Sequence, residues 1–217
     1  MYHSFIKDSL DFLFSLLAII LFLPIFSFVF LIIKLENPLE SAFYIGERTG
    51  KNDKPFKMYK FKTMKKGSEK HGFSTALGDE RLTKTGSFLR KYKLDEIPQF
   101  INVLRGNMSF VGPRPQVSFY TEKYNSQLKK ILSVKPGITD LASIYFSDMD
   151  ATLGEGNVEN KYANEIEPIK NILRLRYVEN RSFSLDAKIF LTTVLMTLGI
   201  KKSLFTSLDK LNDVPKI

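Results

Sequence analysis

The chain has 217 residues, of which 44% are hydrophobic, enough for one globular core and an additional apolar segment. It contains no Cys, which excludes disulfides and thiolate metal sites, and its two His residues (His3 and His71) lie far apart, which argues against a His-ligated zinc site or a Ser-His-Asp triad. Lys and Arg number 32 against 23 Asp and Glu, so the net charge is +9. This balance suits an anionic partner: nucleic acid, an anionic lipid surface or a phosphorylated substrate.

The first predicted element is an apolar run at residues 12–33, interrupted only by Ser15, Pro24 and Ser27. The run is long enough to enter a bilayer. It is not a cleavable signal peptide, because the flank before it carries mixed charges and no small-residue cleavage site follows it. The excess of positive charge follows the run, and positively charged segments stay inside, so we expect the body of the protein in the cytoplasm.

Pro24 lies in the middle of this run and decides its shape. A proline costs roughly 3 kcal/mol inside a helix, whereas each central Leu, Ile, Phe or Val favours insertion by roughly 0.3–0.6 kcal/mol, so insertion survives. One shape is a kinked helix that spans the bilayer. The other is a re-entrant hairpin, in which residues 12–23 enter, the chain breaks at Pro24, and residues 25–33 return. The residues alone favour the spanning helix, since prolines are ordinary in transmembrane helices.

A basic tract follows from Arg48 to Lys70, after a short strand expected at residues 42–45. Within the tract, residues 56–61 alternate apolar and basic side chains, as a half-buried strand does. Lys60 and Lys62 belong to this tract. Its charge has two compatible interpretations: a solvated strand face beside anionic headgroups, or a wall that binds phosphate.

Residues 94–106 contain the most informative passage. Apolar side chains recur at helical spacing across residues 97–104, and Gly106 provides a C-terminal stop. Pro98 is tolerated in a first helical turn, where amides lack partners. The pattern therefore predicts Asp95 at or near the N-cap of a helix and Glu96 in its first turn.

This placement has chemical consequences for Asp95 and Glu96. A helix N-terminus stabilises negative charge, so Asp95 is expected to be ionised and the open amides to accept a phosphate. Adjacent carboxylates can divide work, one attacking phosphorus while the other holds Mg²⁺. The plain alternative is an Asp that caps a helix and does nothing else.

Further elements follow towards the C-terminus. Residues 109–115 predict a short strand that ends before Arg114, which two prolines restrict and which can grip phosphate oxygens bidentately; Arg90 is a second candidate for phosphate charge. The plain alternative for Arg114 is a surface arginine in a rigid turn. Helices are expected around residues 88–92, 116–131, 168–177 and 185–200. The last is either a core helix or one lying in the membrane interface.

Taken together, the sequence resembles the bacterial sugar transferase family, the monotopic polyprenyl-phosphate phosphoglycosyl transferases. The stretches that carry the resemblance are residues 59–64, 81–91, 94–109, 111–115, 135–139 and 182–186. The resemblance covers nearly the whole chain, and the central stretch is too long to arise by chance.

The resemblance implies a two-step reaction. Asp95 attacks the β-phosphate of a UDP-sugar and releases UMP, and a polyprenyl (undecaprenyl) phosphate then takes the sugar phosphate, which initiates assembly of a lipid-linked surface glycan. It implies that Glu96 binds Mg²⁺ and that Arg90 and Arg114 contact phosphates. It also implies that the segment broken at Pro24 is re-entrant, with both ends on the cytoplasmic face of the bacterial inner membrane.

The expected fold is therefore α+β and mostly helical. A re-entrant, proline-broken membrane helix occupies residues 1–36, and a small cytoplasmic phosphoglycosyl transferase domain with short strands and interfacial amphipathic helices occupies residues 37–217. Lys60 and Lys62 are expected to bind substrate phosphate. A homodimer is considered as an assembly, and nucleic acid is not an expected partner.

Several positions depart from the family pattern. Leu23 precedes Pro24 where the family commonly has Ser, and Lys62 replaces an Arg, which keeps the charge but loses the fork. Residues 140–143, Asp-Leu-Ala-Ser, replace the usual Gly-Trp/Leu-Ala-Gln, which bears on the acceptor or sugar side of the site. Two rival functions remain: a membrane-anchored basic scaffold that binds nucleic acid, and a Mg²⁺-dependent nucleotide-sugar hydrolase.

Overall fold

The computed structural model describes residues 5–68, 79–147 and 158–200, so His3, Lys70 and His71 lie outside it. Its elements in chain order are α1 (Lys7–Glu36), β1 (Phe43–Thr49), η2 (Lys51–Asp53), β2 (Pro55–Phe61), α2 (Lys84–Lys91), η4 (Leu94–Glu96), α3 (Gln99–Leu104), β3 (Ser109–Val111), α4 (Ser118–Thr121), η5 (Leu128–Ser133), β4 (Gly137–Thr139), α5 (Leu141–Tyr145), α7 (Val158–Lys161), η6 (Tyr162–Ile166), α8 (Glu167–Asn180) and α9 (Phe183–Thr197). Helices dominate and the strands are few and short, which confirms the mostly helical α+β class.

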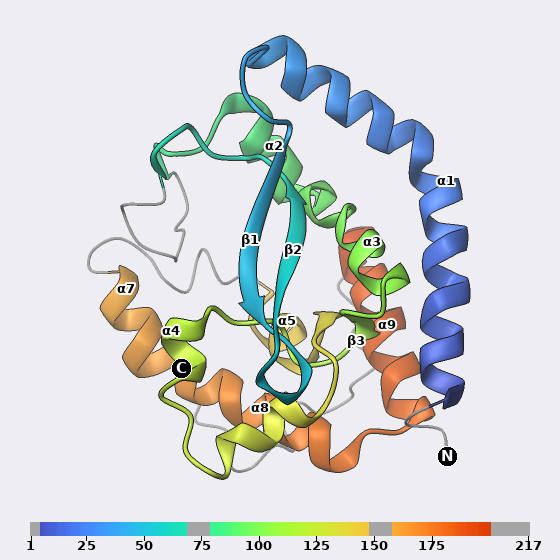
Figure 1. The fold of residues 1–217 in the computed structure, drawn as a ribbon, viewed down its shortest axis with the longest axis vertical. Coiled ribbons are helices and arrows are strands. Elements are labelled where there is room, and N and C mark those ends of the chain that lie inside the picture. The colour runs from blue at the N-terminus through green and yellow to red at the C-terminus, as the bar shows by residue number, and fades with distance from the viewer. Residues whose placement is uncertain (1–4, 69–78, 148–157, 201–217) are drawn as a thin grey trace.

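Helix α1 runs along one edge of the molecule and changes direction part-way along its length (Figure 1). It is one continuous helix with Pro24 in its interior, and it is long and apolar enough to cross a membrane by length and composition. Its large apolar side chains, such as Phe14, Leu21 and Phe28, are exposed, whereas the polar Ser15 faces inward. This pattern is the inverse of a helix packed in water. The re-entrant topology itself stays a prediction.

A long hairpin of β1 and β2 crosses the centre of the molecule (Figure 1). The two strands are antiparallel, with Phe43 opposite Phe61 and Thr49 opposite Pro55. The strand predicted at residues 56–61 is confirmed, and the strand expected at 42–45 begins at Phe43 and continues to Thr49.

The second half of α1 fastens this hairpin to the helices beside it. Val29 and Ile33 are buried against Phe61 of β2, Leu89 of α2 and Ile97 in one apolar cluster. Burying such side chains stabilises the fold by about 1.5–3 kcal/mol each. The apolar helix α1 and Ile97, the residue that follows the Asp95-Glu96 pair, therefore share one core.

The single amphipathic helix predicted at residues 116–131 is wrong. The structure has α4 and η5 instead, separated by turns. The side-chain oxygen of Asn125 accepts a hydrogen bond from the backbone N–H of Leu128 (2.9 Å), and such local bonds compete with helix propagation. Tyr120 and Ile131 are nevertheless buried, so the apolar spacing was a signal of burial and not of one helix.

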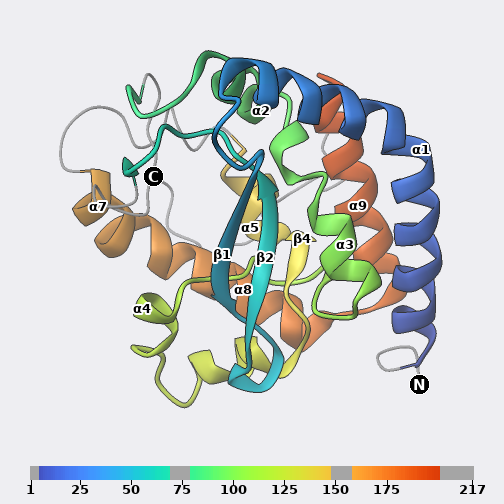
Figure 2. The same ribbon diagram turned by 45° about the horizontal axis from the view of Figure 1, so that its top comes forward.

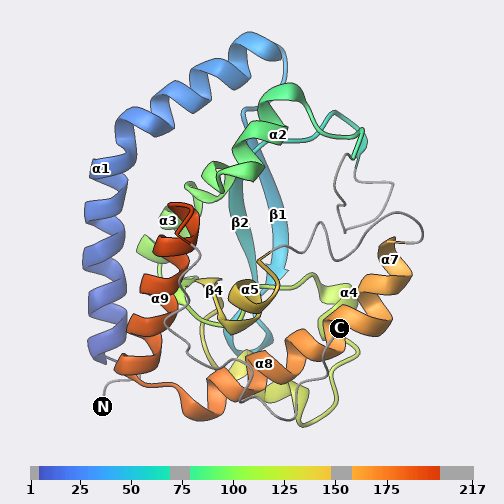
Figure 3. The same cartoon turned by 180° about the vertical axis from the view of Figure 1, so that it is seen from behind.

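Strands β3 and β4 are parallel, and helices α8 and α9 lie against this part of the molecule (Figures 2 and 3). Gly112 and Gly137 allow the two strand ends to meet, because a Cβ on Gly137 would collide with the backbone of Gly112. The helices expected at residues 168–177 and 185–200 correspond to α8 and α9. α9 contributes Ile189 to the core and leaves Phe190 exposed, so its role as a core helix is confirmed and its place in the membrane interface stays a prediction.

Candidate functional site

Asp95 and Glu96 lie in the short 3₁₀ turn η4, before α3 begins. Lys93, the residue before this turn, adopts a left-handed conformation with φ 57°. The N-cap of α3 is Pro98, three residues after Asp95, so Asp95 lies near this N-cap and not at it, and the expectation that Glu96 lies in the first turn of α3 is wrong. A left-handed residue interrupts helical hydrogen bonding, and Pro98 has no N–H to extend α3 backwards. The two carboxylates therefore share a tight turn of their own.

The Asp95 side chain is buried, with 6% of its surface exposed. Burial raises the pKa of this carboxyl above its usual value. The charge of Lys60 opposes that rise, and the neighbouring negative charge of Glu96 adds to it. The site thus holds a desolvated carboxylate among positive side chains, whereas the sequence led us to expect an ionised carboxylate at a helix N-terminus.

Glu96 is contacted by two cations from different parts of the chain. Lys60 Nζ of β2 donates to Glu96 Oε1 at 2.9 Å. Arg114 Nη1 donates to Glu96 Oε2 at 3.2 Å, and its Nη2 contacts Oε1. The hairpin, the Asp-Glu turn and the segment after β3 meet at this carboxylate.

These contacts set the charge of each group. Burial by itself raises the pKa of Glu96, but Arg114 and Lys60 together hold it well below its usual range. Burial lowers the pKa of Lys60, and Glu96 opposes that shift. Glu96 is therefore fully ionised at neutral pH, with side-chain exposure of only 13%.

Arg90 approaches the pair from α2. Its Nε donates to Thr63 Oγ1 at 3.0 Å, and its charge lowers the pKa of Asp95. Close packing fixes this geometry, because a Cβ on Gly86 would collide with the backbone carbonyl of Thr63. The Thr83 side chain caps α2 by accepting from the Gly86 N–H at 2.8 Å.

Lys62 lies elsewhere. Its Nζ pairs with Glu40 Oε2 at 2.6 Å, and both side chains are about one quarter exposed. Of the two lysines predicted to bind phosphate, the structure brings Lys60 to Glu96 and leaves Lys62 with Glu40. The two lysines are two residues apart, a spacing that puts side chains on the same face of a strand, so sequence alternation alone gives no reason to prefer either.

The carboxylates fit the ligand requirements of Mg²⁺. Within residues 5–68, 79–147 and 158–200, no three His, Asp or Glu side chains gather to enclose a metal ion. Mg²⁺ needs no such cage, since it keeps several waters and takes one or two carboxylates together with substrate phosphates. Glu96, beside Asp95, supplies oxygen ligands of this kind.

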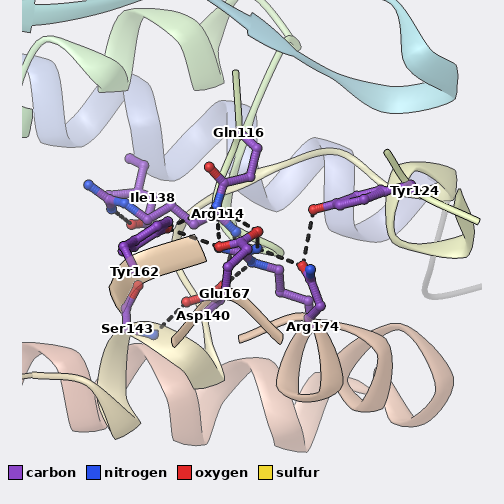
Figure 4. Close-up of polar contacts among 10 residues, drawn as sticks. Arg114, Gln116, Tyr124, Ile138, Asp140, Ser143, Tyr162, Glu167 and Arg174 are labelled. Carbon is purple, nitrogen blue, oxygen red and sulfur yellow. Dashed lines mark hydrogen bonds and ion pairs between the residues drawn. The ribbon is translucent and has the colours of Figure 1, made fainter. Parts of the chain in front are cut away.

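A buried polar network contacts the backbone of Arg114, whose guanidinium contacts Glu96 (Figure 4). The backbone N–H of Arg114 donates to Asp140 Oδ2 at 2.9 Å, and Arg174 Nη1 pairs with Glu167 Oε1 at 2.7 Å. The sequence did not predict these supporting roles. One signal was present: an Asp directly before an apolar stretch, as Asp140 is before Leu141, is typical of an N-cap.

Comparison with known proteins identifies relatives of this chain. The family model described as bacterial sugar transferase matches residues 2–199. A UDP-N-acetylgalactosamine-undecaprenyl-phosphate N-acetylgalactosaminephosphotransferase of Aeromonas hydrophila is 38% identical over 157 residues, covering 69% of this chain and 37% of the relative. A putative undecaprenyl-phosphate N-acetylgalactosaminyl 1-phosphate transferase of Bacillus subtilis is 42% identical over 124 residues, covering 57% and 69%.

A third relative, the UDP-glucose:undecaprenyl-phosphate glucose-1-phosphate transferase of Escherichia coli, is 35% identical over 196 residues, covering 88% of this chain and 40% of the relative. The chain thus spans about two fifths of the length of the Aeromonas and Escherichia relatives. The match of the family model over almost the whole chain agrees with the resemblance drawn from the motifs. The chain belongs to the bacterial sugar transferase family.

Proposed function

We propose that this protein transfers a sugar 1-phosphate from a UDP-sugar to a polyprenyl phosphate, undecaprenyl phosphate in a bacterium. The observation that carries the proposal is the buried Asp95–Glu96 pair, with Lys60, Arg90 and Arg114 placed around it. Three positive side chains suit a diphosphate, and a carboxylate among them suits attack on phosphorus. The Aeromonas and Escherichia relatives are named for transfers of this class.

In the first proposed step, a carboxylate oxygen of Asp95 attacks the β-phosphorus of the UDP-sugar. A bond forms between that oxygen and phosphorus, the bond to the bridging oxygen of UMP breaks, and UMP leaves. In the second step, a phosphate oxygen of the lipid attacks the same phosphorus and Asp95 is released as a carboxylate. The product is a diphosphate-linked lipid sugar, which initiates assembly of a surface glycan.

The positive side chains have defined tasks in this scheme. Arg114 and Lys60 hold Glu96 ionised, and Arg90 faces Asp95 from α2. Glu96 would hold Mg²⁺, which when bound would supply charge that stabilises the diphosphate and the leaving UMP. An Arg90 guanidinium beside the attacked phosphorus offsets the charge that develops on its oxygens.

We also propose that α1 is re-entrant, with residues 1–36 in the inner membrane and residues 37–217 on its cytoplasmic face. Both ends of α1 contact the same folded body: Lys7 pairs with Asp186 at 2.7 Å and Asp8 with Lys135 at 2.9 Å, while Ile33 packs in the core near Phe61. A helix that crossed the bilayer would carry its N-terminus away from that body. The homodimer stays a prediction.

Release of UMP from UDP-sugars separates the proposal from its two rivals. The full chain, incubated with Mg²⁺ and a panel of UDP-sugars, is expected to release many equivalents of UMP only when undecaprenyl phosphate is present. A scaffold releases none in either case. A hydrolase turns over fully without lipid, and that result would overturn the proposed transfer.

A further inference from the structure

Asp140, at the junction of β4 and α5, is completely buried and its carboxylate serves two backbone donors. Its Oδ1 accepts from the N–H of Ser143 at 2.7 Å and so caps α5. Its Oδ2 accepts from the N–H of Arg114 at 2.9 Å (Figure 4). One side chain therefore ties the start of a helix to the segment that carries a candidate phosphate-binding arginine.

The residues on either side of Arg114 cannot replace its backbone hydrogen bond to Asp140. Pro113 and Pro115 have no N–H, so the Arg114 N–H is the one backbone donor of the Pro-Arg-Pro segment. Asp140 accepts that donor, while the Arg114 guanidinium reaches in the other direction to Glu96. The direction in which the Arg114 side chain leaves the backbone is thus fixed at the Asp140 carboxylate.

Arg174 of α8 lies beside the buried Asp140 carboxylate and gives it a cationic neighbour. Arg174 Nε lies 3.9 Å from Asp140 Oδ2, and both side chains are about 1% exposed. The other side of the guanidinium is occupied, because Nη1 donates to Glu167 Oε1 at 2.7 Å and to Asn171 Oδ1 at 2.8 Å. A buried charge with a partner and hydrogen bonds is retained, whereas an unpaired one is not.

We propose that Asp140 is a positioning residue whose carboxylate orients Arg114 onto Glu96 for the transfer reaction. This inference rests on the proposed function, since it gives Arg114 a task in that reaction. It also assigns a purpose to the Asp-Leu-Ala-Ser sequence at residues 140–143, which departs from the common family pattern: the Asp replaces a Gly that has no side chain to accept the Arg114 N–H.

The test compares Asp140→Asn and Asp140→Ser with a matched helix-cap variant. Asn has a single acceptor oxygen and can serve only one of the two N–H donors, and Ser caps helices well but is too short to serve both. Ser182→Ala removes the cap of α9, where Ser182 Oγ accepts from Leu185 N at 3.2 Å, far from Arg114 in the chain. Thermal unfolding of each full chain in detergent confirms that the variants fold.

The first readout is a double-mutant cycle on the rate of UMP release. Asp140→Asn is expected to lower kcat/KM about tenfold or more, as for loss of a hydrogen bond to a charged group. In an Arg114→Ala background, Asp140→Asn should not lower kcat/KM further, because the side chain that Asp140 positions is no longer present. Ser182→Ala should leave the rate unchanged. If Asp140→Asn lowers kcat/KM by the same factor with Arg114 and with Ala at position 114, Asp140 has a structural role independent of Arg114, and the proposal is overturned.

The second readout does not depend on catalysis. Phenylglyoxal labelling of Arg114, followed by peptide mass mapping, should increase several-fold in Asp140→Asn and Asp140→Ser and stay at the wild-type level in Ser182→Ala. Equal labelling of Arg114 in the wild type and both Asp140 variants would contradict the positioning role. If the wild type releases no UMP from any UDP-sugar, the proposed function fails, and this labelling result still decides whether Asp140 holds Arg114.

Discussion

The guanidinium of Arg114 contacts both carboxylate oxygens of Glu96, with Nη1 3.2 Å from Oε2 and Nη2 against Oε1. This two-point contact requires the planar fork of arginine, which lysine lacks. We therefore predict that Arg114→Lys lowers kcat/KM for UMP release by about tenfold or more, although the charge is kept. A steady-state assay at saturating undecaprenyl phosphate measures it, and wild-type kinetics in this variant would show that the fork has no role.

Lys60 and Lys62 form a matched pair for testing the phosphate-binding wall. Lys60 pairs with Glu96, whose side chain is 13% exposed, whereas Lys62 pairs with Glu40, whose side chain is 28% exposed. Lys60→Met should reduce the rate of UMP release by at least about tenfold, since it leaves the Glu96 charge with one partner fewer. Lys62→Met should stay within about twofold of wild type, because exposed ion pairs contribute about 0–1 kcal/mol. A larger loss in Lys62→Met than in Lys60→Met would refute this placement of the site.

We expect the ionised Asp95 carboxylate to be needed for activity but to lower the stability of the fold. Burial raises the folded-state pKa of Asp95, so its favourable contribution is complete below the unfolded-state pKa and is lost as pH rises through the folded-state pKa. Asp95→Asn cannot ionise, so it avoids this loss of stability and should unfold at a higher temperature than wild type at neutral pH. Each kcal/mol gained corresponds to about 2–4 °C in a chain of this size.

The pH dependence supplies the control for this stability effect. The difference in melting temperature between Asp95→Asn and wild type should shrink as pH falls and the wild-type carboxyl becomes protonated. Glu96 has the opposite sign: its lowered pKa gives stability that is present above the unfolded-state value and lost as pH falls. A melting temperature of Asp95→Asn below that of wild type at neutral pH would be inconsistent with an Asp95 whose pKa is raised by burial.

Pro24 should decide the topology of α1. Replacing Pro24 by Ala restores a backbone donor and favours a straight helix, and 30 residues at about 1.5 Å each exceed a bilayer core of about 30 Å. In the wild type, which has no Cys, single cysteines introduced at positions 2 and 53 should both react with a membrane-impermeant maleimide only from the cytoplasmic side.

In Pro24→Ala, a measurable fraction of the cysteine at position 2 should become reactive from the periplasm, while position 53 keeps its side. Pro38→Ala, just beyond the C-terminal end of α1, serves as the matched control and should leave both labels cytoplasmic. Periplasmic labelling at position 2 in the wild type would rule out the re-entrant arrangement.

Much of the fold could be predicted from local sequence. The strand at residues 56–61 and the helices near residues 168–177 and 185–200 follow from periodicity, which reports which faces are buried. The same signal failed at residues 116–131, because Tyr120 and Ile131 are buried from two short elements and Asn125 diverts the backbone between them. Periodicity identifies buried positions and does not say whether one helix carries them.

The sequence predicted which residues form the site better than it predicted the contacts between them. Motifs indicated Asp95, Glu96 and Arg114, but the pairing of Lys60 rather than Lys62 with Glu96 depends on how the hairpin packs on η4. The support of Arg114 by Asp140 joins residues 26 positions apart. Such contacts depend on tertiary packing, which a single sequence does not encode in any local pattern.

In the proposed reaction, Asp95 carries the sugar phosphate between the two steps. Intact-mass spectrometry of the full chain, after incubation with Mg²⁺ and a UDP-sugar but no lipid acceptor, tests it most directly. The wild type should gain the mass of one sugar phosphate, located by peptide mapping to Asp95 and lost on adding undecaprenyl phosphate, and Asp95→Asn should gain none. Turnover by Asp95→Asn at the wild-type rate, or an adduct on a different residue, would contradict the account.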